Sequence, residues 1–171
     1  MTLITTVPQR LALMLMDADE HIKFVAEGFQ KNYDADIQLP AWEISDGGSN
    51  YDIIAANIAN PVDTYNAQLI TQKYGTGVDD DTTRVSEYQT LTRSILQNTV
   101  EYFLKRPDLV FSDVRGVSTT GALPALRGVK WCKISREPDG VYGGDEGFGK
   151  FWGGKLTFTV MTEIQVMRVN R

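Results

Sequence analysis

The sequence predicts a single α+β domain, residues 1–171, in which two long helices pack on a mostly antiparallel sheet and a long β-hairpin lies near the C-terminus. Three observations predict this fold. Apolar residues recur at helical spacing in two separate segments, and apolar and polar residues alternate over residues 155–169. The chain has 171 residues, of which 42% are hydrophobic and 23% are charged, as expected of one globular domain.

The first helix is predicted over residues 9–32. Pro8 suits a first helical turn, and Thr6 precedes it as a candidate cap. From there the apolar positions follow one another at steps of three and four, which describes one face of a helix over about five turns. These positions are Leu11, Leu15, Ala18, Ile22, Val25 and Phe29.

The region after this helix is predicted to be irregular. Two short extended runs, residues 36–39 and 41–44, are separated by Pro40, which favours a sheet edge or a loop. Residues 46–50 read Asp-Gly-Gly-Ser-Asn and form a turn cluster. The spacing of the apolar residues over 51–59 then suggests a short helix.

A strand and a second helix follow. β-branched and aromatic residues predict a strand over residues 64–74. The second helix is predicted over residues 83–105, because the acidic residues 79–81 complement its positive N-terminus and Pro107 stops it. Its core-facing positions are Tyr88, Leu91, Ile95, Thr99 and Tyr102.

The last third of the chain predicts strands. A short strand is expected at residues 109–111, followed by a link rich in Gly, Ser and Thr at 116–121 and a longer strand at 129–135. Residues 155–169 give the clearest signal, since their apolar side chains fall on alternate positions. A long strand with one buried face follows from that period of two.

Residues 137–154, between the last two strands, contain seven glycines and four aromatic residues. Glycine permits tight turns but has no side chain to pack in a core, whereas aromatic side chains are costly to leave in water. We therefore expect a hairpin loop that projects from the domain and contacts another subunit. The alternatives are an inert flexible loop, or aromatic side chains that fold back on their own sheet. The predicted contact residues are Tyr142, Asp145, Glu146, Phe148, Phe151 and Trp152.

The charge of the chain is negative overall and unevenly placed. The formal net charge is −5, with −9 in residues 1–83 (4 basic and 13 acidic) and +4 in residues 84–171 (13 basic and 9 acidic). An acidic chain disfavours phosphate backbones, so no sequence-specific nucleic-acid partner is expected. Either the acidic surface of one subunit packs on the basic surface of a neighbour, or both excesses are simply solvated.

No stretch of 18 apolar residues occurs, so no membrane span is predicted. The first residues lack the basic leader and apolar core of a signal peptide. We therefore expect synthesis and assembly in the cytoplasm.

Few side chains suggest chemistry. Cys132 is the only cysteine and His21 is the only histidine, which excludes the usual Cys/His zinc sites. We interpret Cys132 as a buried strand residue. Asp17 lies four residues before His21 and could form a metal or proton-relay pair with it, although a solvated helix face is the simpler interpretation. Residues 79–81 are acidic but lack the spacing of a calcium-binding loop. The glycine run at 147–153 leads into a strand, whereas a dinucleotide-binding loop leads into a helix. We predict no catalytic residue, no cofactor and no metal.

The order of elements resembles that of the small tail-terminator and neck proteins of tailed bacteriophages. The shared features are a long N-terminal helix, a central strand, a second helix and a C-terminal hairpin that ends in one long alternating strand. The closing segment, residues 152–166, carries most of the resemblance and reads Trp-Gly-Gly-Lys-Leu-Thr-Phe-Thr-Val-Met-Thr-Glu-Ile-Gln-Val. Residues 40–62 are longer than the family pattern needs.

The resemblance implies a non-enzymatic virion protein that forms a homo-hexameric ring, caps the tail tube and joins it to the head-side connector. In such a ring two different patches of one subunit must match, because the interface is heterologous. The alternatives are a small α+β enzyme or ligand-binding domain with a cleft beside the hairpin, and a tail-tube or baseplate ring protein.

Overall fold

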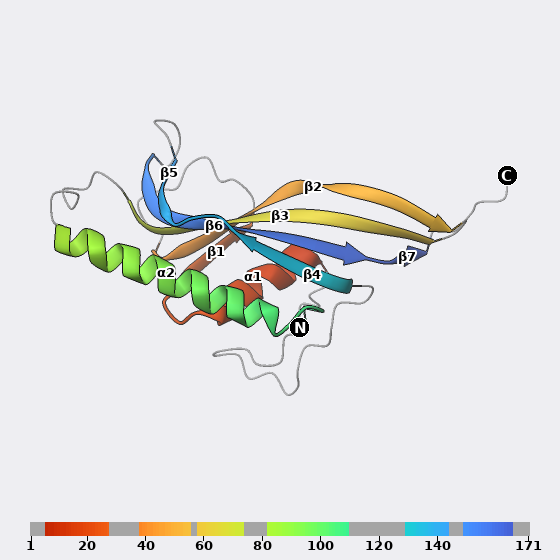
Figure 1. Ribbon diagram of the computed structural model, residues 1–171, viewed down its shortest axis with the longest axis horizontal. Helices are drawn as coiled ribbons and strands as arrows, with labels where there is room; N and C mark the ends of the chain where they lie inside the picture. The colour runs from red at the N-terminus through yellow and green to blue at the C-terminus, as the bar shows by residue number, and fades with distance from the viewer. Residues whose placement is uncertain are drawn as a thin grey trace.

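The computed structural model describes residues 6–27, 38–55, 58–73, 82–109, 129–143 and 149–165. In this part of the chain two helices pack on one face of a mixed sheet, which confirms the α+β class (Figure 1). The elements, in chain order, are α1 (Val7–Ala18), β1 (Phe24–Glu27), β2 (Ala41–Ala55), β3 (Ile58–Lys73), α2 (Thr82–Leu104), β4 (Val129–Arg136), β5 (Gly140–Tyr142), β6 (Phe151–Thr162) and β7 (Ile164–Gln165).

The sheet has the strand order β1-β2-β3-β6-β4, with β5 beside β6 and β7 beside β3. Only β1 and β2 are parallel, and every other pair among the described strands is antiparallel. The prediction of a mostly antiparallel sheet is therefore correct, and the parallel edge strand is the feature that the sequence did not indicate.

Helix α1 begins as predicted but ends early. The Thr6 hydroxyl accepts the Gln9 N–H at 3.4 Å, and a proline occupies the first turn. After Ala18 the backbone of Asp19 is extended, and the Asp19 carboxylate accepts the His21 N–H at 2.9 Å, which closes a turn. The predicted helix over residues 9–32 is thus wrong over residues 19–27, because this local hydrogen bond competes with the next helical turn, and residues 28–32 lie outside the described residues.

β1 lies where the middle of that helix was expected. Its residues pair in parallel with the start of β2, from Phe24 opposite Ala41 to Glu27 opposite Ile44. The apolar positions that suggested a helix are still used by the core, since Ile22 is buried and Val25 packs against the core from β1. Residue 29 lies outside the described residues.

β2 and β3 form a long antiparallel pair that replaces the turn predicted at residues 46–50. The helix predicted at 51–59 is likewise wrong over residues 51–55 and 58–59, which are strand, and residues 56–57 lie outside the described residues. The Asp-Gly-Gly sequence forms a bulge between Asp46 and Ser49 instead of a turn. Gly48 supplies a positive φ of 95°, and its N–H donates to Asp46 Oδ1 at 2.7 Å. A bulge accommodates turn-type residues without ending the strand.

The C-terminal strands agree with the alternating pattern in their described part. β4 confirms the strand predicted at 129–135, and β6 starts four residues before the strand predicted at 155–169. β6 ends at Thr162, and β7 continues beside β3. The strand predicted at 64–74 corresponds to the second half of β3. Residues 166–169, 110–111 and 116–121 lie outside the described residues.

Helix α2 agrees closely with the helix predicted over 83–105. Ile95, Leu96 and Phe103 are buried on the sheet, and the rings of Phe103 and Phe158 lie 4.7 Å apart. The core lies between the two helices and the centre of the sheet. Its largest fully buried side chains are Trp42, Phe158, Leu11, Met14, Leu15, Leu69, Ile95, Leu96, Leu109 and Leu156. No helix in the described ranges is long and apolar enough to cross a membrane.

Candidate functional site

The described residues of the predicted hairpin lie against their own sheet. β5 pairs with the first residues of β6, so Tyr142 stands opposite Phe151. Their rings stack at 6.3 Å between centroids, and the Tyr142 hydroxyl donates to the Pro138 carbonyl. Phe151 is only 7% exposed, and Trp152 is half-buried. Asp145, Glu146 and Phe148 lie outside the described residues, so contact of this loop with a neighbour remains a prediction.

A buried aspartate joins the turn after α1 to α2. The Asp19 carboxylate accepts hydrogen bonds from Asn98 Nδ2 at 2.7 Å and from His21 Nδ1 at 2.8 Å, besides the His21 N–H. Burial alone would raise the pKa of Asp19, but these hydrogen bonds outweigh it and hold the pKa below its ordinary value. Asp19 is therefore a charged clamp between two elements that are 79 residues apart.

The Asp17–His21 pair that was considered as an alternative does not form, because the helix ends between these two residues, and His21 therefore does not lie on a helix face. Asp17 instead accepts the Tyr102 hydroxyl at 2.9 Å. Arg106 stacks over the Tyr102 ring at 3.8 Å from the centroid and donates to the Tyr102 carbonyl. This second link holds the C-terminal half of α2 against α1.

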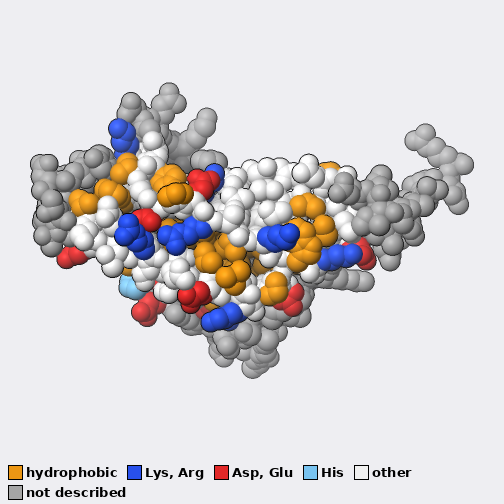
Figure 2. Space-filling view, in the orientation of Figure 1, with side chains coloured by type: hydrophobic (Ala, Val, Ile, Leu, Met, Phe, Trp, Pro, Cys, Tyr) orange, Lys and Arg blue, Asp and Glu red, His pale blue; other side chains and the backbone are white. Residues whose placement is uncertain are grey.

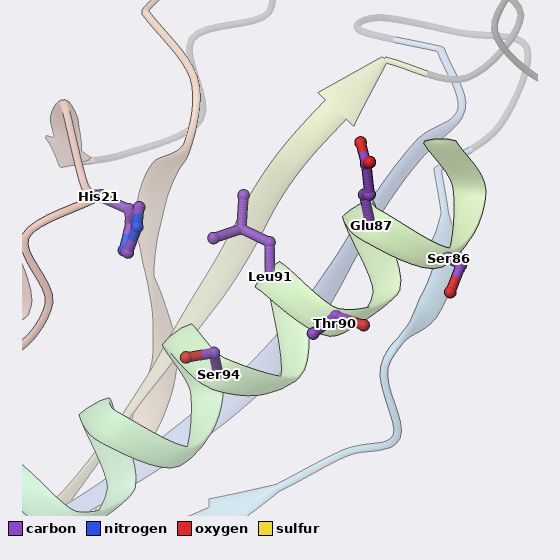
Figure 3. Close-up of a pocket in the computed structure, with 6 residues that line it drawn as sticks. All are labelled: His21, Ser86, Glu87, Thr90, Leu91 and Ser94. Carbon is purple, nitrogen blue, oxygen red and sulfur yellow. The ribbon is translucent and has the colours of Figure 1, made fainter. Parts of the chain in front are cut away.

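A shallow groove of about 420 Å³ runs between the turn at His21 and α2. Figure 3 shows His21 on one side of it, with Leu91 and Ser94 reaching from α2 toward the His21 side. Because Asp19 is an acceptor, His21 Nδ1 donates to it, which leaves Nε2 for a molecule in the groove. The groove can therefore offer one oriented imidazole beside small hydroxyl groups. Its lining residues are His21, Ser86, Glu87, Thr90, Leu91 and Ser94.

Cys132 lies in β4 and packs against the core, in agreement with the interpretation as a strand residue. Burial raises the pKa of its thiol to about 12. A thiol with such a pKa stays protonated near neutral pH and is a poor nucleophile. In the described part of the chain no three His, Cys, Asp or Glu side chains gather closely enough to hold a metal ion. The acidic residues 79–81 fall outside that part.

Strands β2 and β4, which lie on opposite sides of the central strands β3 and β6, differ in charge. β2 contains three acidic residues (Glu43, Asp46 and Asp52) and no basic one. β4 contains three basic residues (Lys130, Lys133 and Arg136) and no acidic one. Figure 2 shows Lys and Arg side chains spread over the face on which β4 lies. Glu43 is buried, so the exposed charges described on these strands are Asp46 on β2 and Lys130, Lys133 and Arg136 on β4.

No protein-family model matches this chain, and no curated protein matches it either.

The sequence interpretation missed the features that depend on distant pairs. The hydrogen bond between Asp19 and Asn98 cannot be predicted from neighbouring residues. An aspartate is common after a helix, and its presence there does not indicate a distant partner. The acidic edge of β2 was missed because residues 46–59 were assigned to a turn and a helix. The alternation of Trp42 and Ile44 with Glu43 and Ser45 is a period-two signal that would have extended that strand.

Proposed function

We propose that this chain is a structural subunit of a tailed-bacteriophage virion, a tail terminator or neck protein that forms a ring, caps the tail tube and joins it to the head-side connector. The observation that carries the proposal is the part of the sheet that extends beyond the helices. In Figure 1, α1 and α2 lie under one part of the sheet, and β2, β3 and β7 continue past both helices.

A ribbon of strands without helix cover lacks the second layer against which a sheet buries its apolar face. A small sheet needs an apolar face that packs, or a covering helix, for stability of its own. On the extended part of β2, Tyr51 is 68% exposed. Such an arm is expected in a protein whose neighbour supplies the missing contacts, as a ring subunit would.

The charge layout supports a head-to-tail arrangement. The first half of the chain carries the acidic excess and the second half the basic excess, with formal charges of −9 and +4. In a heterologous ring each subunit presents two different surfaces to its neighbours, so opposite charges on those surfaces attract at every interface. The symmetry that the resemblance implies is a hexamer.

Light scattering coupled to size-exclusion chromatography tests this proposal. We expect a discrete hexamer that negative-stain microscopy shows as a ring, and that binds purified tail tubes at one end. A chain that remains monomeric at every concentration tested and does not bind tubes would contradict the proposal. A stack of rings that grows along its axis would instead indicate the tail-tube or baseplate alternative.

The predicted hairpin contact has its own test. Deleting Gly143 to Gly149 removes the loop, whereas Tyr142 and Phe151 remain on the sheet. If the loop contacts a neighbouring subunit or an adjacent ring, the shortened protein stays folded but loses its oligomer or its attachment to the tail. Unchanged assembly would show that the loop is only a connection.

The groove beside His21 favours the ligand-binding alternative. An imidazole oriented by a buried carboxylate is a common arrangement in binding and catalytic sites. Because His21 is the only histidine in the chain, its NMR signals are assigned without ambiguity. Shifts of these signals on addition of a small-molecule library, absent in Asn98→Leu, would support this function over the structural one.

A further inference from the structure

The outer edge of β2 is open over most of its length. β1 pairs with only the first four residues of β2, from Ala41 to Ile44. Beyond them, residues 45–55 meet a strand on the β3 side alone, as far as the chain is described. An open edge of this length presents backbone N–H and C=O groups that another strand can pair with.

The outer edge of β4, at the opposite end of the sheet, is open over a shorter stretch. The Cys132 N–H turns away from β6 and donates to the Pro107 carbonyl at 2.6 Å. Alternate residues of a strand direct their backbone groups to the same side, so Ile134 and Arg136 also direct theirs away from β6. In the described ranges no strand lies beside residues 133–136 on that side.

The two open edges are complementary in charge. Asp46 is exposed on β2, where its carboxylate accepts the Gly48 N–H and keeps its charge available to a neighbour. On the open stretch of β4, Lys133 lies over the Trp131 ring at 4.7 Å and Arg136 pairs with Asp139 at 3.4 Å. These exposed contacts are worth about 1 kcal/mol or less, so they can be exchanged for contacts with another subunit.

We propose that β2 residues 45–55 of one copy pair with β4 residues 133–136 of the next copy, which continues the sheet from subunit to subunit. The inference rests on the proposed ring function and names the surfaces that close it. Pairing of β2 with a second β2 is disfavoured, because it would bring the exposed Asp46 carboxylate of each copy to another acidic edge. The acidic edge of one copy is instead attracted to the basic edge of the next copy. This contact joins two different surfaces, so it is heterologous and allows a closed ring.

Charge reversal on each edge gives a complementation test. One variant carries Asp46→Lys and Asp52→Lys, so that both of its edges are basic, and the other carries Lys133→Glu and Arg136→Glu, so that both are acidic. Each variant alone should self-associate roughly tenfold more weakly than the wild type. An equimolar mixture should assemble again, and native mass spectrometry should show alternating subunits in even numbers.

Matched controls reverse exposed charges away from the edges. Glu20→Lys with Glu101→Lys, and Lys23→Glu with Lys105→Glu, alter the net charge equally and should assemble as the wild type does. Circular dichroism and thermal unfolding of each variant confirm that the subunit is folded before assembly is compared. Wild-type assembly should also weaken with added salt, since the attraction is between charges near the surface.

The outcomes separate this inference from the proposed function. If the wild type forms rings and both charge-reversed variants assemble as it does, the β2–β4 pairing is wrong and the ring stands. If the basic-edge variant self-associates normally while the mixture gains nothing, β2 pairs with β2 and the inference is likewise overturned. If the wild type never assembles, the ring proposal fails first. Restoration by mixing alone supports the pairing.

Discussion

Replacing Gly153 with alanine should destabilise the protein because the sheet leaves no room for a β-carbon there. Gly153 lies in β6 between Ile70 of β3 and Gly140 of β5. A Cβ atom built at this position would stand 1.8 Å from the Leu69 carbonyl oxygen, whereas real Cβ contacts are essentially never under 3.0 Å. The oxygen would have to move by at least 3.0 − 1.8 = 1.2 Å, and it belongs to the backbone of a central strand.

The expected cost follows from the rigidity of that backbone. Overpacking in a well-packed interior typically costs about 1–3 kcal/mol, and a backbone clash belongs at the upper end of that range. For a domain of this size the loss corresponds to a decrease in Tm of roughly 4–12 °C. Urea unfolding measures the change, with Trp42, which is 1% exposed, as a fluorescent reporter of the core.

Gly140 provides the matched control, because it pairs directly with Gly153 from β5. No atom lies within 4 Å of a Cβ built at Gly140. Gly140→Ala should therefore be neutral or stabilise the protein by up to about 1 kcal/mol, because alanine lowers the conformational entropy of the unfolded chain. The reasoning is refuted if Gly153→Ala unfolds within about 0.5 kcal/mol of the wild type, the range of ordinary surface substitutions.

Three further predictions follow from side chains in and near the core. Ile95→Ala should lower the free energy of unfolding by about 2–4 kcal/mol, because Ile95 is fully buried. Leu91→Ala should lower it by clearly less, because Leu91 lines the open groove. Equal losses of the two variants in urea unfolding would contradict this reasoning. The folded-state pKa of Asp19 is lowered, so its contribution to stability is present above the unfolded pKa of about 3.9 and is lost as the pH falls through the folded pKa. Asp19→Asn should therefore flatten the decrease in the urea midpoint between about pH 5 and pH 2, and an unchanged pH profile would show that Asp19 does not act as a charged clamp. The raised pKa of Cys132 predicts slow reaction with iodoacetamide at pH 8 in the native protein and ordinary reaction after unfolding, whereas rapid native labelling would show an accessible thiolate.

The sequence by itself determined the elements whose residues contain their own periodic signal. Helix α2 and strand β6 each carry a long and regular apolar pattern, so their place and type could be predicted within a few residues. Cys132 could likewise be placed on a strand from its neighbours alone. The start of α1 could also be predicted from the sequence, because an N-terminal cap such as Thr6 depends only on the residues of the first turn.

Tertiary structure decided the elements whose local signals were short or ambiguous. The apolar residues from Ile22 to Val25 fit a helix as well as a strand, and the carboxylate of Asp19, held by Asn98 of α2, settled the choice by closing a turn. Residues 46–55 contain turn formers, yet pairing with β3 incorporated them into a strand through a bulge at Gly48. The acidic and basic edges also exist only after folding, because the strand order sets β2 toward one end of the sheet and β4 at the other. Hydrogen bonds and pairings between residues far apart in the chain supply energies that no short window of sequence contains.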